Sequence, residues 1–195
     1  MKQRSSTLSR RDALAGALIL GMGNAFRANS ADGAAAAPAA VAPANDFAFL
    51  IGAWRVRHHK LKGRLVGSTE WSDFGGTCRA WPLLGAAANV DDNILHAPDG
   101  QYRGVTLRRR HPETGKWWIW WLDDKGAGLE PPVVGDFKDG VGTFFGDDQL
   151  RGQPIRVRFI WSEISSGAAR WEQAFSPDQG RTWEVNWVMH FERDA

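Results

Sequence analysis

The chain has 195 residues, 43% of them hydrophobic and 24% charged, with a formal net charge of +2. This near-neutral balance argues against nucleic acid as a partner, because affinity for a phosphate backbone needs a concentrated positive face. A short basic run over 108–110 would alternate between the two faces of a strand, and we interpret it as a solvated strand end. The one cysteine, Cys78, has no second cysteine to pair with, so stability must come from packing. We expect Cys78 to be a small buried apolar residue rather than a nucleophile.

The first 31 residues have the order of a bacterial export signal. A basic stretch ending in Arg10 and Arg11 precedes a short, mildly apolar segment over 13–22, and small residues follow. A membrane span would need about 20 apolar residues, so this order predicts a cleaved signal peptide. Paired arginines before a weakly apolar core resemble a twin-arginine signal, whose machinery exports folded proteins. We expect a periplasmic or secreted protein with no integral membrane segment in its mature form.

The composition divides the chain into three parts. Residues 1–31 are the predicted signal, 32–45 an Ala/Pro-rich flexible linker, and 46–195 one domain able to bury a core. The signal carries most of the excess of basic over acidic residues. Its removal leaves a slightly acidic mature protein, so the sequence pI of about 8.9 describes the precursor.

From Asp46 onward, short runs of β-branched and aromatic residues are separated by turn residues such as Pro98-Asp99-Gly100 and Asp139-Gly140. After a short helical turn over 46–51, capped by Asn45 or Asp46, we expect strands. Their predicted ranges are 53–61, 67–74, 78–82, 89–95, 102–109, 116–122, 141–146, 155–163, 169–176 and 182–192. Short strands joined by hairpin turns predict an all-β fold, an antiparallel barrel of about eight to ten strands.

Tryptophan is the unusual component, since all 11 tryptophans lie beyond residue 45. In the strand over 116–122, alternation puts Trp117 and Trp121 on one face and Trp118 and Trp120 on the other. Aromatic residues on both faces indicate that both are covered, at least in part. Two interpretations remain open: a barrel core filled by indoles, or an aromatic-lined ligand cavity.

The segment 47–56 carries a resemblance to known barrels. It places Gly52 and Trp54 at the start of the first strand, and this Gly-x-Trp resembles the opening of lipocalin-like barrels. The resemblance implies that Trp54 plugs the closed end and that an arginine of the last strand, here Arg193, packs over it. Residues 45–193 together resemble an uncharacterised bacterial family of calycin-like barrels. That likeness implies architecture and no particular chemistry.

A second motif, over 176–183, resembles the Asp-box hairpin of sialidases and other propellers. There the Asp satisfies turn backbone groups and the aromatic ring anchors the hairpin. One copy in a short chain excludes a propeller. We therefore assign structural roles to Asp178, Gly180 and Trp183.

Signals for catalysis are sparse. The five histidines form no cluster with metal-ligand spacing, so no metal and no cofactor is predicted. Haem is an alternative, because distantly similar barrels hold haem through one histidine near the final strand, here His190. Glu172 lies mid-strand, where a charge needs a partner such as Arg156 or Arg158. If Glu172 and His190 face a cavity, they are the candidate general acid or base.

The leading hypothesis is reversible binding of a small hydrophobic or aromatic molecule in the barrel. The residues expected to stack on the ligand are Trp118, Trp120, Trp161 and Trp187, and those expected to orient it are Asn89, Asp91, Asn186 and His190. One alternative is a cofactor-free lyase, isomerase or hydrolase in the same cavity. Another is a haem-binding barrel or an interaction protein that forms a homodimer through surface tryptophans.

Overall fold

The computed structural model describes residues 46–126 and 128–194, and the predicted signal and linker lie outside them. In this part, no helix has the length and apolar character needed to cross a membrane. Two short 3-10 turns are present, η1 (Ala48–Leu50) and η2 (Leu84–Ala86). The strands are β1 (Gly52–Leu61), β2 (Trp71–Leu83), β3 (Ala88–Ala97), β4 (Gly100–Arg110), β5 (Trp117–Asp123), β6 (Val133–Lys138), β7 (Val141–Leu150), β8 (Gln153–Ser162), β9 (Ala168–Ser176) and β10 (Glu184–Arg193).

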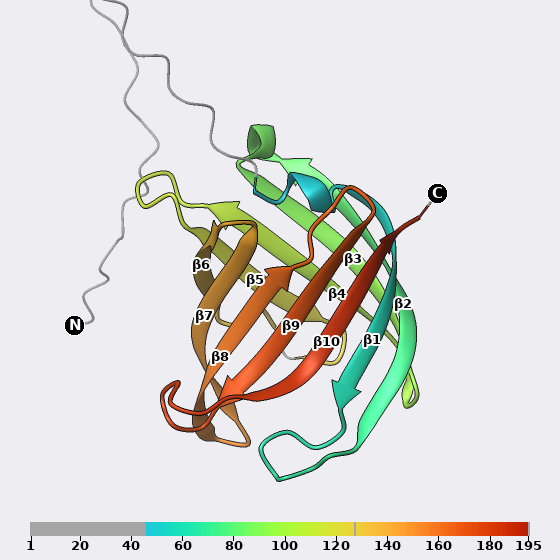
Figure 1. Ribbon diagram of the computed structural model, residues 1–195, viewed down its shortest axis with the longest axis vertical. Coiled ribbons are helices and arrows are strands. Elements are labelled where there is room, and N and C mark those ends of the chain that lie inside the picture. Colours follow the sequence, from blue (N-terminus) through green and yellow to red (C-terminus); the bar gives the residue numbers. More distant parts are fainter. Residues whose placement is uncertain (1–45, 127, 195) are drawn as a thin grey trace, which may run out of the picture. The chain divides into compact units, whose positions relative to one another are not determined.

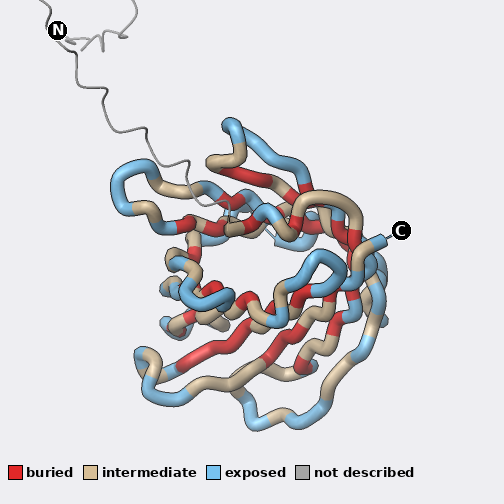
Figure 2. The backbone as a smooth tube through the Cα atoms, turned by 45° about the horizontal axis from the view of Figure 1, so that its top comes forward, coloured by how far each residue is buried: buried red, intermediate tan, exposed pale blue. Residues whose placement is uncertain are grey.

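The strands form one closed antiparallel barrel (Figure 1). Each strand pairs with its neighbours along the chain, and β1 pairs with β10 from Trp54 opposite Arg193 to Lys60 opposite Trp187. Buried stretches lie along the strands, whereas the connecting loops are mostly exposed or intermediate (Figure 2). The all-β prediction is confirmed, and the ten strands meet the upper limit of the expected number.

Two of the predicted strands are one strand. The ranges 67–74 and 78–82 were separated at Gly75-Gly76, but β2 continues through both glycines. Gly76 is extended and close to its neighbours, because a Cβ there would lie 2.5 Å from the carbonyl oxygen of Ile94 on β3. Here glycine permits a close approach between strands instead of a turn.

The predicted set also lacked β6. This strand follows Pro131-Pro132 and contains Gly135, so it carries few strand-forming signals. Gly135 sits where a Cβ would come 1.9 Å from the carbonyl oxygen of Thr143 on β7. Because β2 was predicted as two strands and β6 was not predicted, the predicted and observed numbers of strands are both ten.

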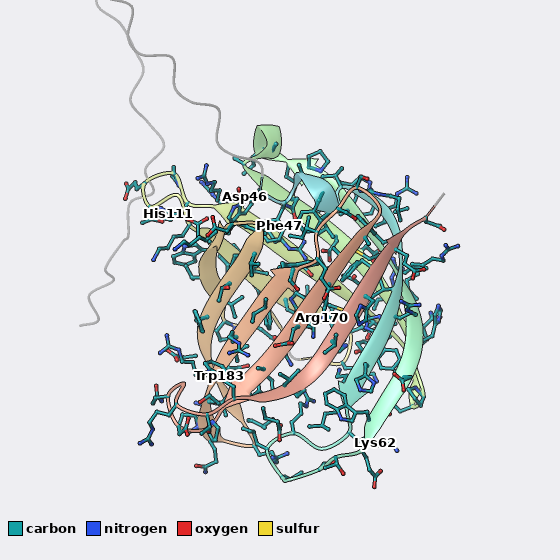
Figure 3. All side chains as sticks on the ribbon, viewed as in Figure 1. Asp46, Phe47, Lys62, His111, Arg170 and Trp183 are labelled. Atoms are coloured by element: carbon teal, nitrogen blue, oxygen red, sulfur yellow. The ribbon has the colours of Figure 1, made fainter. Side chains whose placement is uncertain are left out.

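The predicted helical turn is shorter than expected and lacks the predicted cap. Its first flanking residue is Phe47, which makes no side-chain capping hydrogen bond. The carboxylate of Asp46 instead accepts a hydrogen bond of 2.9 Å from Nε1 of Trp117 on β5. Asp46 and Phe47 lie at the end of the barrel opposite Lys62 and Trp183 (Figure 3). The turn is therefore held to the barrel wall by a tertiary contact.

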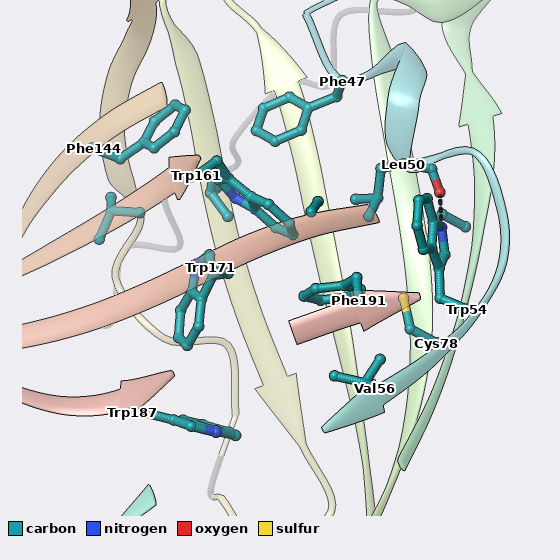
Figure 4. Packing of buried hydrophobic residues seen from close by; sticks show 14 of the residues in the cluster. Phe47, Leu50, Trp54, Val56, Cys78, Phe144, Trp161, Trp171, Trp187 and Phe191 are labelled. Atoms are coloured by element: carbon teal, nitrogen blue, oxygen red, sulfur yellow. Dashed lines mark hydrogen bonds between the residues drawn. The ribbon is translucent and has the colours of Figure 1, made fainter. Parts of the chain in front are cut away.

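Trp54 closes the same end of the barrel. Its Nε1 donates to the carbonyl oxygen of Leu50 at 2.7 Å (Figure 4). The guanidinium of Arg193 lies 4.0 Å from the ring centroid and donates to the carbonyl oxygens of Ile51 and Phe49 at 2.6 and 2.7 Å. Gly52 makes this contact feasible, since its φ is +123° and a Cβ would lie 2.5 Å from Nη1 of Arg193.

The aromatic core is densest beneath this plug. Phe47, Phe144 and Trp161 are fully or almost fully buried, and Phe47 meets Trp117 edge-on at 4.9 Å between centroids. Cys78 is buried beside Trp54, and burial raises the pKa of its thiol. Phenylalanine and tryptophan rings thus fill one end of the barrel, and the other end is free to hold a cavity.

Candidate functional site

A cavity of about 670 Å³ occupies the barrel from below the plug to the opposite end. Its inner limit is formed by Arg108, Trp161 and Phe191, and its outer limit by loop and turn residues such as Arg64 and Asp99. This volume lies within the range of small-molecule sites, about 300–1,000 Å³.

Strand alternation decides which side chains reach the cavity. Along β4, every second residue from Tyr102 through Thr106 to Arg108 faces inward, and Gly104 occupies the second of these four inward positions. The rings that line the cavity come from six strands. They are Phe74, Tyr102, Trp121, Phe159, Trp161, Trp171, Phe175, Trp187 and Phe191. The cavity therefore has an aromatic wall.

A polar network crosses the inner wall near the plugged end. Arg108 donates from Nη1 to Asp91 at 2.5 Å and to Asn89 at 3.1 Å. Asp91 also accepts from Nδ2 of Asn93 at 2.5 Å and from the backbone amide of Thr106 at 3.2 Å. The Asp91 carboxylate is thus satisfied on both oxygens, as a buried charge requires.

Arg108 differs from what its sequence context predicted. The run 108–110 was interpreted as a solvated strand end, but Arg108 is 3% exposed and lines the cavity. Its Nε atom is buried without a hydrogen-bond partner in the described part of the chain. In the sequence, Arg108 has the same alternating position as Tyr102 and Thr106, and this pattern could have shown that it shares their face of the strand.

His58 occupies the middle of the cavity wall, on β1. Its ring stacks on Phe74 at 4.6 Å between centroids, and its Nδ1 accepts a hydrogen bond of 3.2 Å from Nε1 of Trp187. Burial, with smaller contributions from Lys60 and His96, lowers its pKa from 6.5 to about 3. His58 is therefore neutral at physiological pH, with Nδ1 as the acceptor.

The outer half of the cavity combines charge with aromatic rings. Nζ of Lys60 lies 3.7 Å from the Trp187 ring centroid and 3.3 Å from the Tyr102 hydroxyl oxygen. Burial, followed by Arg64, lowers the pKa of Lys60 from 10.5 to about 8. Burial, followed by Asp148, raises that of Glu130 from 4.5 to about 7. Both groups are thus closer to neutrality than ordinary surface charges.

Trp121 is opposite Thr106 in the register, and its ring lies against the inner wall over Gly104 of β4. A Cβ on Gly104 would lie 2.2 Å from Cη2 of Trp121. The indole also donates from Nε1 to Asp123 at 2.9 Å. These two contacts keep the ring flat along the wall and leave the cavity open.

The residues expected to stack on a ligand divide into two groups. Trp161 and Trp187 line the cavity. Trp118 and Trp120 point to the outside of β5, where Trp118 lies near His111, with 5.9 Å between ring centroids. The strand contributes Ile119 and Trp121 to the cavity in their place. Alternation predicted two faces, but the sequence did not reveal which of them faces inward.

The residues expected to orient a ligand are also divided. Asp91 lines the cavity, and Asn89 lies behind it as a partner of Arg108. Asn186 is fully buried at a β-bulge in β10 and accepts a hydrogen bond of 2.8 Å from Gln173. Gln173 itself reaches the cavity, so Asn186 acts on it indirectly.

The two candidate acid–base residues lie on the outer face of the barrel. Glu172 pairs with Arg158 at 3.5 Å and with Arg170 at 2.8 Å. The structural ion pair foreseen for Glu172 therefore exists, but with Arg170 in place of Arg156. His190 lies opposite Arg57 on β1 and Arg170 on β9. Neither Glu172 nor His190 is among the residues that line the cavity.

This placement does not suit haem. His190 faces away from the cavity, and the inward histidine is His58. Because Nδ1 of His58 accepts from Trp187, its proton lies on Nε2, the nitrogen that would have to ligate iron. Among the described residues, no group of three or more His, Cys, Asp or Glu side chains is placed to hold a metal ion.

The hairpin between β9 and β10 is held by its own side chains. Asp178 accepts from the amide and hydroxyl of Thr182 at 2.8 and 2.7 Å, and these bonds lower its pKa to about 2. Trp183 donates from Nε1 to the carbonyl oxygen of Gly180 at 3.0 Å. None of these hairpin residues lines the cavity, so their contacts stabilise the turn itself.

The fold and site define a closed antiparallel barrel with an aromatic cavity open at one end. No protein-family model matches the chain, and no curated protein sequence matches it either.

Proposed function

We propose that this chain binds a small hydrophobic or aromatic molecule inside the barrel. The observation that carries the proposal is the aromatic cavity, whose wall includes Trp121, Trp171 and Trp187. Rings on several strands allow a flat ligand to be enclosed on more than one side. A bicyclic aromatic of about ten heavy atoms would bind with a Kd on the order of micromolar.

Titration with a neutral, polarity-sensitive dye such as Nile red tests this function. Trp121 and Trp120 are adjacent on β5, with Trp121 facing the cavity and Trp120 facing outward. We expect Trp121→Leu to weaken dye binding by about fivefold, since an aromatic contact contributes about 1 kcal/mol. Trp120→Leu should leave binding unchanged. Equal losses in both variants, or no saturable binding by the wild-type chain, would contradict the proposal.

Three features support the further proposal that the barrel is lipocalin-like. Trp54 follows Gly52 at the start of β1, a short turn precedes it, and Arg193 of the last strand covers its ring. This arrangement fits the one that the sequence resemblance implied. We assign the plugged end as a fixed base and the opposite end as the ligand entrance.

Export is the second part of the proposal. The order of basic, apolar and small residues over 1–31 supports a twin-arginine signal. A barrel with one buried thiol needs no disulfide and is able to fold before export. Replacing Arg10 and Arg11 together with lysine should retain the precursor in the cytoplasm. Unchanged export of that variant would refute the proposed route.

A second candidate function rests on the outer face of the barrel. The register aligns Trp81, Val90, Leu107 and Trp120 across β2 to β5. Trp81 is 41% exposed and Leu107 is 36% exposed. Such an apolar row is a candidate contact between two copies of the chain, related by a two-fold axis.

Sedimentation over a range of concentrations tests this contact. Leu107→Lys should abolish a dimer, because it would place a charge in the middle of the apolar row. Phe145→Lys, which alters an exposed aromatic on β7, serves as the control. A wild-type chain that stays monomeric at all concentrations would rule out this candidate.

A further inference from the structure

Lys60 is a largely buried amine without an ion-pair partner in the described part of the chain. Its alternating position on β1 directs it into the cavity, where its nearest described contacts are the Trp187 ring and the Tyr102 hydroxyl. Three of the four other cationic side chains of the lining differ in this respect. Arg108 binds Asp91, Lys125 binds Asp99 and Lys62 binds Glu70.

The surrounding charges disfavour an acidic ligand. The lining holds six carboxylates, namely Asp91, Asp99, Asp123, Glu130, Asp147 and Asp148, against five cationic side chains, namely Lys60, Lys62, Arg64, Arg108 and Lys125. Because a carboxylate ligand would add a further negative charge, it would meet repulsion. A neutral carbonyl compound would enter without that penalty. Lys60 is then positioned to meet an electrophile rather than an anion.

We propose that Lys60 is a covalent capture site for small aromatic aldehydes, which it holds as an imine inside the barrel. The inference rests on the proposed binding function, because the aldehyde must first enter the aromatic cavity. Trp187 and Tyr102 adjoin the amine, so an aryl group bound there has its carbonyl within reach of Nζ.

The reaction is a condensation without a redox change. The nitrogen lone pair of the neutral amine attacks the carbonyl carbon, and the π electrons move to oxygen. Transfer of a proton from nitrogen to that oxygen gives a carbinolamine. Loss of its hydroxyl group, protonated to water, and of the second nitrogen proton leaves the C=N bond. One aldehyde and one amine thus become one imine and one water.

The environment of Lys60 increases the supply of neutral amine. With a pKa of about 8, roughly a tenth of the amine is neutral at pH 7, against about one part in three thousand at the ordinary value. The charged and titratable groups around it are His58 on β1, Arg64 in the β1–β2 loop, Asp99 in the β3–β4 turn, Tyr102 on β4, Asp123 and Lys125 at the end of β5, and Glu130 before β6. Arg64 and Lys125 favour the neutral amine, whereas Asp123 and Asp99 oppose it.

The test uses 2-naphthaldehyde with cyanoborohydride, which reduces an imine to a stable amine. Treatment of the purified full chain at pH 7, followed by peptide mass mapping, compares Lys60 with the other described lysines, Lys62, Lys116, Lys125 and Lys138. We expect Lys60 to be modified at least about tenfold faster than any of them, because more of its amine is neutral. Lys60→Met should lose this adduct. Lys138→Met should retain it, because Lys138 is exposed on β6 and is not among the residues that line the cavity.

A companion measurement separates the two proposals. Binding of the matched alcohol, 2-naphthalenemethanol, is followed by quenching of tryptophan fluorescence. If the alcohol binds and labelling is equal at all lysines, the capture site is overturned while the binding function stands. If the alcohol does not bind the wild-type chain, both are overturned. Lys60-dependent binding of 2-naphthoate without an adduct would show an anion anchor and would also overturn the inference.

Discussion

At the scale of single residues, the most deeply buried ion pair in the described part of the chain joins Arg108 and Asp91. Both side chains are at most 4% exposed, and Nη1 of Arg108 lies 2.5 Å from Oδ2 of Asp91. A buried charge that loses its partner is strongly destabilising, by about 3–5 kcal/mol. The pair therefore fixes this part of the inner wall.

We expect Arg108→Met to lower the free energy of unfolding by about 3–5 kcal/mol, because it leaves the Asp91 carboxylate buried without its cation. Denaturant unfolding measures the change. The exposed cross-strand pair of Arg57 and Glu192, 3.1 Å apart, is the control. Arg57→Met should cost at most about 1 kcal/mol. Similar effects at both sites would show that burial does not govern the Arg108 pair.

The pH dependence of stability should report on His58. Its pKa is lowered from 6.5 to about 3 on folding, chiefly by burial, so between these values the unfolded state binds more protons. Stability from this group is therefore complete above pH 6.5 and is lost as the pH falls toward 3, by about 3–5 kcal/mol in total.

The measurement is the difference in unfolding free energy between the wild type and His58→Gln from pH 3 to 7. That difference removes the opposite contribution of Glu130, whose raised pKa makes stability fall as pH rises from 4.5 to about 7. A difference that does not change with pH would contradict the assignment of a buried, neutral His58.

The sequence predicted residue roles unevenly. Trp54 and Asp178 make hydrogen bonds to residues four positions away in the chain, and local motifs predicted their structural roles. Gly52 instead lies against Arg193 of the last strand. The inward direction of Lys60 and Arg108 could not, because alternation defines two faces without saying which one is enclosed. A β-bulge between Val185 and Trp187 also interrupts the alternation of inward and outward side chains along β10.

At the scale of elements, the contact between η1, β1 and β10 closes the barrel base. We expect Arg193→Met to destabilise the protein by about 2–3 kcal/mol, because it removes three charge-assisted hydrogen bonds to carbonyl oxygens and the cation–π contact with Trp54. Arg55→Met, which affects an exposed pair with Asp194, should change stability by less than about 1 kcal/mol. Thermal unfolding compares the two variants, and equal shifts in Tm would refute the role of Arg193.

The pairing of β4 with β5 controls the width of the cavity. We expect Gly104→Val to displace the Trp121 indole into the cavity and to weaken binding of a neutral aromatic probe by about tenfold or more, with a stability cost of about 1–3 kcal/mol. Gly75→Val is the control, since no atom lies within 4 Å of a Cβ at that position. Fluorescence titration and unfolding curves measure both effects. Unchanged affinity in Gly104→Val would show that Trp121 does not border the ligand.

Strand boundaries show where sequence patterns fail. Glycines and prolines were interpreted as turns, but Gly76 and Gly135 lie inside strands at close interstrand approaches. These approaches bring together residues of neighbouring strands, Gly76 with Ile94 and Gly135 with Thr143, and depend on how the strands pair. A local pattern therefore identifies the β class and misplaces the elements that depend on those contacts.

At the scale of the whole molecule, the barrel was predictable and its contents were not. Short alternating runs with hairpin turns indicated antiparallel closure, and the ten-stranded barrel confirms this. The tryptophan-rich composition left a filled core and a cavity equally open. The structure contains both, with indoles packed beneath the plug and a cavity of about 670 Å³ beyond them.

The most direct test of ligand binding in the cavity is native mass spectrometry of the mature protein purified from its own host, beside the Gly104→Val variant. We predict a small organic mass bound to the wild-type protein, released on denaturation and depleted in the variant. A wild-type protein that carries no small molecule and takes up no added neutral aromatic compound would contradict the account. A bound mass retained equally by the variant would place the ligand outside the cavity and would contradict it as well.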